Sequence, residues 1–146
     1  MLQVADFGVA TRSGFENTFS SDAAHGTIRY MAPEVLFGKY NLAADTYSFA
    51  LLAWEIVHEE VPFKNATPIA AVLLTQNGTQ PQCEVPAKCA PALAALLARC
   101  WGLEPASRPL LSEVVAEVEQ LEAQQSAHAA GGEPTETLKS IMSIGV

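Results

Sequence analysis

Residues 44–58, with the sequence ADTYSFALLAWEIVH, decide the fold of this chain. Their spacing suits a helix, and apolar side chains occur on nearly every side of it, so that Glu55 is the clearly polar residue of its central turns. A helix that is apolar all round is normally buried in the middle of a domain. We therefore expect other elements of the chain to pack around residues 44–58.

Three further helices are expected after this one, and their apolar faces must dock on a partner surface. Residues 69–76 form a short apolar stretch that ends at Asn77-Gly78. Apolar residues then recur at helical spacing from Leu93 to Trp101 and from Leu111 to Leu121, with Gly102 ending the former and Ser112 as a possible amino-terminal cap of the latter. Three prolines exclude a regular helix between residues 79 and 91, and no strand signal stands out. The fold class is therefore mainly α.

Composition sets broad limits on the function. The 146 residues carry a net charge of −8, which disfavours nucleic acid as a partner, and 49% of them are hydrophobic, which is enough for one domain with a sizeable core. The cysteines Cys83, Cys89 and Cys100 have neither metal-ligand spacing nor an even count, and this pattern favours a reducing compartment. No leader or membrane span is evident, so we expect a cytoplasmic protein.

The two ends of the chain differ from its middle. From Asp6 to about Met31 the sequence is rich in Ser, Thr, Gly and Asp without periodicity, and a loop of this length is usually functional or disordered. Residues 126–146 turn to Ser, Ala, Gly and Pro and are expected to form a mobile tail.

Four short motifs occur in a fixed order. They are Asp6-Phe7-Gly8, the stretch 26–34 (GTIRYMAPE), the stretch 44–49 with Trp54-Glu55-Ile56, and Cys100-Trp101 followed by Arg108-Pro109. Each triplet alone is a weak signal, but the ordered set resembles the carboxy-terminal lobe of a protein kinase over residues 1 to about 125. The wording of residues 29–31 is similar to the serine/threonine type, and the later blocks are similar to the tyrosine-kinase-like group.

This resemblance implies a domain organisation. Residues 1–125 would be a partial kinase domain, in which residues 6–34 form the activation segment and residues 35–125 form the helical carboxy-terminal lobe. The chain resembles a kinase domain truncated before its magnesium-binding motif, without the amino-terminal lobe and the catalytic loop. The glycines never show the Gly-x-Gly-x-x-Gly spacing, and none of the three histidines begins a His-Arg-Asp triplet.

The resemblance also implies roles for the first motif. Asp6 would bind the Mg²⁺ that bridges the phosphates of ATP, Phe7 would pack into the core, and Gly8 would supply a backbone hinge. A turn aspartate that caps the chain is the structural alternative for Asp6.

Further candidate residues lie in and after the activation segment. Thr27 resembles the threonine beneath the substrate hydroxyl, and the resemblance implies that residues 26–31 form the peptide-docking surface. A loop hydroxyl bonded to its own backbone is the alternative for Thr27. The hydroxyls that are candidates for phosphorylation belong to Thr11, Ser13, Thr18, Ser20 and Ser21. For each of these hydroxyls a solvated polar loop is the simpler interpretation. Arg12 and Arg29 are the nearby cations that could pair with such a phosphate.

Two structural roles are expected in the helical lobe. Glu34 and Arg108 resemble a buried ion pair that joins the end of the activation segment to the loop before the last helix. Asp45 is expected to cap the start of the central helix, where a carboxylate suits the positive end of the helix dipole.

The function classes that remain are two. The resemblance implies a piece of an enzyme that phosphorylates Ser or Thr on proteins with Mg²⁺ and ATP, with little activity or tight cofactor binding expected of this chain alone. The alternative is a non-catalytic module that binds a substrate or regulatory protein. In both cases apolar surface left uncovered would favour self-association.

Overall fold

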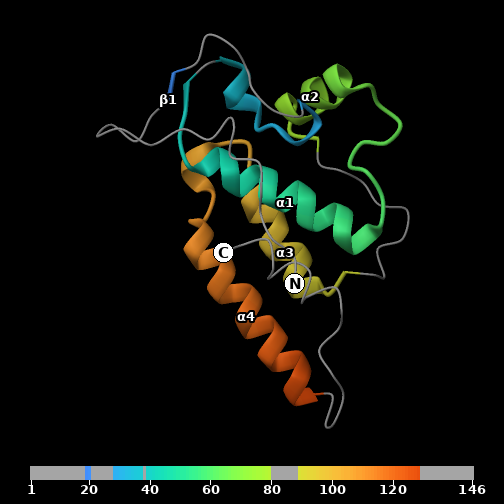
Figure 1. The fold of residues 1–146 in the computed structure, drawn as a ribbon, viewed down its shortest axis with the longest axis vertical. Coiled ribbons are helices and arrows are strands. Elements are labelled where there is room, and N and C mark those ends of the chain that lie inside the picture. The colour runs from blue at the N-terminus through green and yellow to red at the C-terminus, as the bar shows by residue number, and fades with distance from the viewer. Residues whose placement is uncertain (1–18, 21–27, 38, 80–88, 129–146) are drawn as a thin grey trace, which may run out of the picture.

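The chain forms a mainly helical lobe, as expected, in a computed structural model that describes residues 19–20, 28–37, 39–79 and 89–128 (Figure 1). Within these ranges the α-helices are Ala43–His58 (α1), Pro68–Gln76 (α2), Pro91–Cys100 (α3) and Leu111–His128 (α4). Short 3-10 helices cover Ile28–Tyr30 (η2), Pro33–Phe37 (η3) and Pro105–Ser107 (η5).

Helix α1 is buried at the centre of the lobe. Leu51 and Ala53 are fully buried and Trp54 is 4% exposed, so the helix contacts other elements on most of its sides. It packs against α3 and α4, whereas α2 lies beyond α1 on the side away from α4 (Figure 1). The all-round apolar character of residues 44–58 therefore predicted their position correctly.

The helical core lies where α1, α3 and α4 meet. Its buried members are Phe49, Ala50, Ala53, Trp54, Val57, Leu93, Leu96, Leu97, Cys100, Val114 and Val118. A smaller cluster of Ala32, Ala44, Tyr47 and Leu51 packs under the turn that leads into η3. Through the smaller cluster, residues 28–37 pack against the first half of α1.

Two strands form a minimal antiparallel pair. Phe19–Ser20 (β1) lies against Lys39–Tyr40 (β2), with Phe19 opposite Tyr40. The sequence showed no strand signal because alternation over two residues is too short to be recognised. This pair joins the segment before η2 to the segment before α1.

Helix α4 differs from expectation at both ends. The Glu113 carboxylate accepts a hydrogen bond from the Leu110 backbone N–H at 2.8 Å, so Glu113 and not Ser112 supplies the amino-terminal side-chain contact. The helix continues to His128 and so passes residue 125, because no Gly or Pro interrupts it before Gly131. Residues 129–146 lie outside the described residues.

None of the helices in the described stretches has the combination of length and apolar character that crossing a lipid bilayer requires.

Candidate functional site

An ion pair between Glu34 and Arg108 connects two segments that lie far apart in the sequence. Glu34 lies in η3, and Arg108 directly follows η5. Both terminal guanidinium nitrogens of Arg108 donate hydrogen bonds to the Glu34 carboxylate, Nη1 to Oε1 at 2.6 Å and Nη2 to Oε2 at 2.9 Å. The Arg108 side chain is fully buried and the Glu34 side chain is 16% exposed. A two-point contact of this kind fixes orientation as well as distance.

The remaining donors of Arg108 bind backbone carbonyls. Nε donates to Gly102 O at 2.7 Å, Nη1 donates to Ala43 O at 3.0 Å, and Nη2 lies 3.4 Å from Leu103 O. With the two bonds to Glu34, all five N–H donors of the guanidinium have partners. The Tyr47 ring lies below the charge, with its centroid 5.0 Å from Arg108 Cζ. Arg108 therefore joins η3, the start of α1 and the end of α3.

Gly102 makes this arrangement possible. A Cβ atom at this position would lie 3.1 Å from Ser107 Oγ and 3.3 Å from Arg99 O. A side chain here would require the Ser107 hydroxyl or the turn after α3 to shift by a few tenths of an ångström. Glycine thus allows a close approach of this turn to η5, with its carbonyl at Arg108.

Tyr30 ties the segment before η3 to α1. Its hydroxyl donates a short hydrogen bond to Glu55 Oε2, and its carbonyl accepts a hydrogen bond from Ser48 Oγ at 2.9 Å. Burial, together with the hydrogen bond to the Glu55 carboxylate, raises the pKa of Tyr30 to about 12. The phenol therefore stays protonated, as a donor to this carboxylate must.

Arg29 connects η2 to the loop between α1 and α2, a contact that the sequence did not reveal. Its guanidinium donates to the carbonyls of Pro62, Phe63 and Ala66 in the loop between α1 and α2. From the sequence, Arg29 was expected only as a partner for a phosphate. A loop without regular structure carries no periodic signal from which these carbonyl contacts could be read.

Asp45 does not act as the cap that the sequence suggested. Helix α1 begins at Ala43, and no side chain makes a cap hydrogen bond to it from the Leu42 position. Instead, Asn41 Oδ1 accepts a hydrogen bond from the Ala43 N–H at 2.9 Å. Asp45 lies in the first turn with an exposed side chain, and partial desolvation raises the pKa of its carboxyl, opposite to the direction expected from a stabilising helix dipole.

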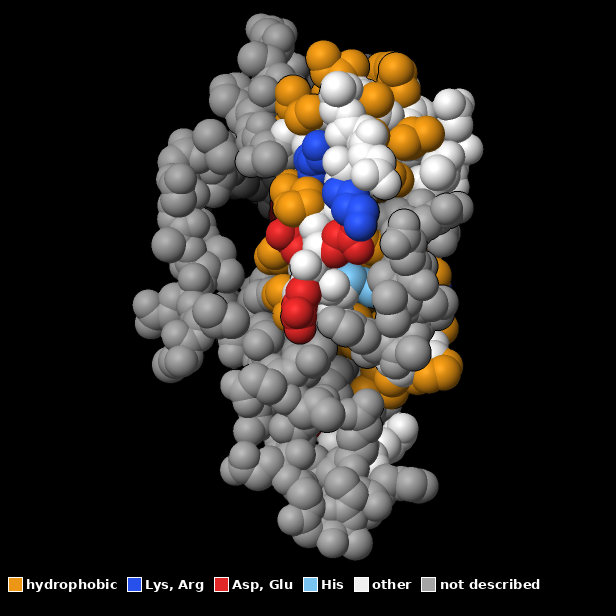
Figure 2. Space-filling model, turned by 90° about the vertical axis from the view of Figure 1, so that its right-hand side faces the viewer, with side chains coloured by type: hydrophobic (Ala, Val, Ile, Leu, Met, Phe, Trp, Pro, Cys, Tyr) orange, Lys and Arg blue, Asp and Glu red, His pale blue; other side chains and the backbone are white. Residues whose placement is uncertain are grey.

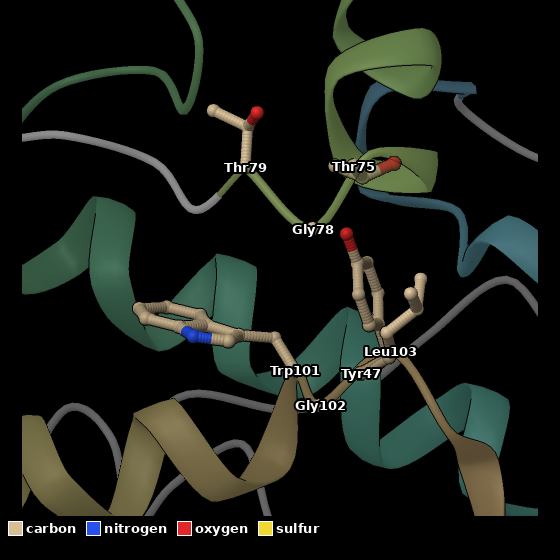
Figure 3. A pocket seen from close by; sticks show the side chains of 7 residues that line it. All are labelled: Tyr47, Thr75, Gly78, Thr79, Trp101, Gly102 and Leu103. Carbon is tan, nitrogen blue, oxygen red and sulfur yellow. The ribbon is translucent and has the colours of Figure 1, made fainter.

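A small cavity of about 80 Å³ lies between α1, the end of α2 and the turn after α3 (Figure 3). Figure 3 shows the Tyr47 hydroxyl directed toward Gly78 and Thr75. Ligand pockets usually measure about 300 to 1,000 Å³, so this cavity is too small for a nucleotide. Beside it, Trp101 Nε1 is buried, and it is the one such side-chain nitrogen or oxygen of the described residues without a hydrogen-bond partner.

Most of the candidate residues in the activation segment lie outside the described residues. These are Asp6, Phe7, Gly8, Thr11, Ser13, Thr18, Ser21 and Thr27. Ser20 is described only as part of the backbone of β1. The structure brings Glu34 and Arg108 together, leaves Asp45 exposed, and shows no geometry for the expected Mg²⁺ ligand.

Comparisons with known proteins agree with the order of the motifs. The family model for protein tyrosine and serine/threonine kinases matches residues 1–118. Serine/threonine-protein kinase STY17 of Arabidopsis thaliana is 40% identical, over 83% of this chain and 21% of its own length. Serine/threonine/tyrosine-protein kinase HT1 of the same plant is 37% identical, over 82% of this chain and 30% of its own length.

A mammalian relative shows the same relation. Receptor-interacting serine/threonine-protein kinase 4 of Mus musculus is 31% identical, over 82% of this chain and 16% of its own length. The chain thus spans less than a third of each of these relatives. Because the family model covers most of its residues, and because its helices form the carboxy-terminal lobe that the motifs imply, the chain belongs to the protein tyrosine and serine/threonine kinase family.

Proposed function

We propose that this chain is the substrate-binding half of a protein kinase that transfers the γ-phosphoryl group of ATP to Ser or Thr hydroxyls of proteins. The observation that carries the proposal is the attachment of residues 28–37 to the helical lobe. This segment is bound by Glu34 to Arg108 and by Tyr30 to Glu55. A segment that positions a peptide substrate must be rigid, since positioning supplies most of the catalysis in phosphoryl transfer.

The first motif would supply the contact to the nucleotide. A carboxylate is the kind of ligand that Mg²⁺ prefers, and Mg²⁺ commonly takes one or two protein carboxylates together with phosphate oxygens. Asp6 fits this pattern, with Phe7 and Gly8 setting its position. Mg²⁺–ATP supplies the phosphoryl group when bound. Thr27 would support the substrate hydroxyl from the start of the peptide-docking stretch 26–31.

The other parts of the machinery would come from a segment on the amino-terminal side. A glycine-rich loop, a phosphate-binding lysine and a His-Arg-Asp loop are not found among the 146 residues, and we propose that residues 1–125 are a partial domain. The surface of helix α1 supports the proposal of a further segment. Asp45 and Leu52 lie two turns apart on the same side of the helix, and both are exposed. We propose that the missing segment covers this side of α1.

A phosphate on the activation segment would need an arginine other than Arg29 as its partner. The candidate acceptors remain Thr11, Ser13, Thr18, Ser20 and Ser21. Because the Arg29 guanidinium is occupied by three carbonyls, Arg12 is the nearby arginine that we propose as partner for a phosphate.

The test compares the chain alone with the chain joined to the coding sequence that precedes it. Transfer of radiolabelled phosphate from ATP to a generic protein substrate is expected for the joined protein and not for residues 1–146. Asp6→Asn should abolish transfer, while Glu119→Gln on the exposed side of α4 serves as the matched control. Transfer that survives Asp6→Asn, or a joined protein without transfer, would overturn the proposal.

A non-catalytic binding module is the second candidate, and the surface of α2 favours it. Ile69 and Leu73 are 68% and 55% exposed and lie one turn apart, on a helix without charged residues. Figure 2 shows hydrophobic side chains gathered at the end of the molecule where α2 lies, above a band of charged ones. Such a surface suits a protein substrate, a regulatory protein or a second copy of the chain in the cytoplasm.

The two candidates predict different behaviour of the isolated chain. A binding module must remain folded by circular dichroism and sediment as a defined species, and Ile69→Lys with Leu73→Lys should shift any dimer to monomer. A half-domain that only functions within the intact kinase is expected to sediment unchanged by these substitutions. The paired control Glu119→Gln with Glu122→Gln alters one exposed and one half-buried position of α4 instead.

A further inference from the structure

The guanidinium of Arg29 occupies a concave group of three carbonyl oxygens. Nη1 donates to Pro62 O at 2.9 Å and to Phe63 O at 2.6 Å, and Nη2 donates to Ala66 O at 2.9 Å. Arg29 is separated from these residues by 33 to 37 positions in the sequence and is half-buried. Hydrogen bonds from a charged donor are about twice as strong as neutral ones, so this contact is one of the strong links of the lobe.

The loop that supplies the carbonyls has an unusual backbone. Phe63 has a φ of 54°, in the left-handed region that a bulky side chain rarely adopts. Its carbonyl accepts hydrogen bonds both from Arg29 and from the Ala66 N–H at 2.9 Å. The carbonyls of Pro62, Phe63 and Ala66 all accept hydrogen bonds from one guanidinium. A left-handed residue of this kind persists where the surrounding contacts hold it, and the Arg29 contact is one of these.

The segment that carries Arg29 is also bound on its other side. Tyr30, the next residue, contacts Glu55 and Ser48 of α1, and the Met31 N–H donates to Ile28 O at 3.2 Å. Helix α2, which directly follows the carbonyl loop, packs against η2. Tyr30 thus fixes the short helix Ile28–Tyr30 to α1, and Arg29 fixes it to the loop before α2.

We propose that Arg29 is a positioning residue for the peptide substrate, which sets the place of residues 28–31 of the docking stretch through its contact with the carbonyls of residues 62, 63 and 66. This inference rests on the proposed function. Arg29 does not contact the reacting atoms. Its effect passes through the backbone of η2, so that displacement of the loop before α2 displaces the peptide-docking stretch as well.

The geometry requires arginine at this position. Two nitrogens of one planar group reach carbonyls that are up to four residues apart in the loop, whereas an ammonium group is a single point with a stronger hydration shell. The substitution Arg29→Lys would keep the charge and lose the planar fork of donors. This variant therefore separates the role of the contact geometry from the role of charge.

The contact itself is tested on the 146-residue chain by hydrogen–deuterium exchange. We expect Arg29→Met to increase exchange at least fivefold in residues 28–31 and in residues 61–66 together, with no change in α3 and α4. Arg29→Lys should give a smaller increase in the same two segments. Arg99→Met removes an exposed cation elsewhere and is the matched control. Unchanged exchange in residues 61–66, or an equal increase in every helix, would refute the contact as a local link.

The positioning role is tested by steady-state kinetics on the chain joined to its preceding coding sequence. Arg29→Met should raise KM for a peptide substrate about tenfold, with kcat and KM for ATP changed less than twofold, and Arg29→Lys should recover part of the loss. A fall in kcat with unchanged peptide KM would refute the role. If the wild-type joined protein transfers no phosphate, the proposed function fails, and the exchange experiment still decides whether the contact exists.

Discussion

The helical core and the segment of residues 28–37 are held in place by different combinations of contacts. The core between α1, α3 and α4 consists of close-packed apolar side chains, whereas the segment combines a small apolar cluster around Ala32 with polar side-chain links to α1 and to Arg108. Apolar burial is non-directional and tolerates small shifts, but a two-point ion pair fixes one geometry. The comparison teaches that the polar links of the segment fix a geometry in addition to their contribution to stability, whereas the core contributes stability without fixing one orientation.

The largest effect is expected from the buried ion pair. Glu34→Gln leaves the fully buried Arg108 charge without a counter-ion, and such a loss costs about 3 to 5 kcal/mol in the free energy of unfolding. Urea denaturation followed by circular dichroism measures this. A loss below about 1 kcal/mol would mean that the carbonyls around Arg108 suffice, and the division between the two regions would no longer hold.

The helical core is expected to follow closely. Leu96→Ala on α3 removes a side chain that is 2% exposed, and truncations of this kind cost about 2 to 5 kcal/mol. Hydrogen exchange should rise over α1, α3 and α4 together. Leu73→Ala at an exposed position of α2 is the control, and its urea midpoint should stay close to that of the wild type.

A smaller effect is expected at alkaline pH. Burial raises the pKa of Cys100 from 9.0 to about 12, so the folded state keeps the proton that the unfolded state releases above pH 9. The stability contribution is complete below pH 9 and is lost as the pH rises toward 12. Between about pH 8 and pH 10 the wild type should lose about 1 kcal/mol more than Cys100→Ala. Parallel pH profiles of the two proteins would contradict this.

The smallest effect is expected from an exposed ion pair. Arg99 and Glu117 pair between α3 and α4 with both side chains more than 40% exposed. Glu117→Gln should change the free energy of unfolding by less than about 0.5 kcal/mol, because solvent screens such pairs. The substitution matches Glu34→Gln in chemistry and differs in burial, so equal losses in the two variants would remove burial as the cause.

The parts of the fold that follow a period were predictable from the sequence. Leu93, Leu96, Leu97 and Cys100 recur at helical spacing, and all four are buried on α3. The short helices η2 and η3 were not predicted, since three to five residues carry no period and their shape depends on tertiary contacts.

The candidate site was only partly predictable, because its contacts join residues that are far apart in the sequence. Glu34 and Arg108 are 74 residues apart, and only the resemblance to a family suggested that they meet. The contacts of Arg29 and the exposure of Asp45 depend on where loops place carbonyls and on which elements cover α1, and local sequence contains neither kind of information.

The span between Glu34 and Arg108 has a consequence for the synthesis of the protein. A ribosome adds about 5 to 20 residues per second, so Arg108 is made roughly 4 to 15 s after Glu34. During this interval η3 lacks its counter-charge and the apolar sides of α1 lack α3 and α4. The ion pair and the helical core can therefore form only after Arg108 and then α4 have been translated, so the earlier segments remain without these contacts during the interval.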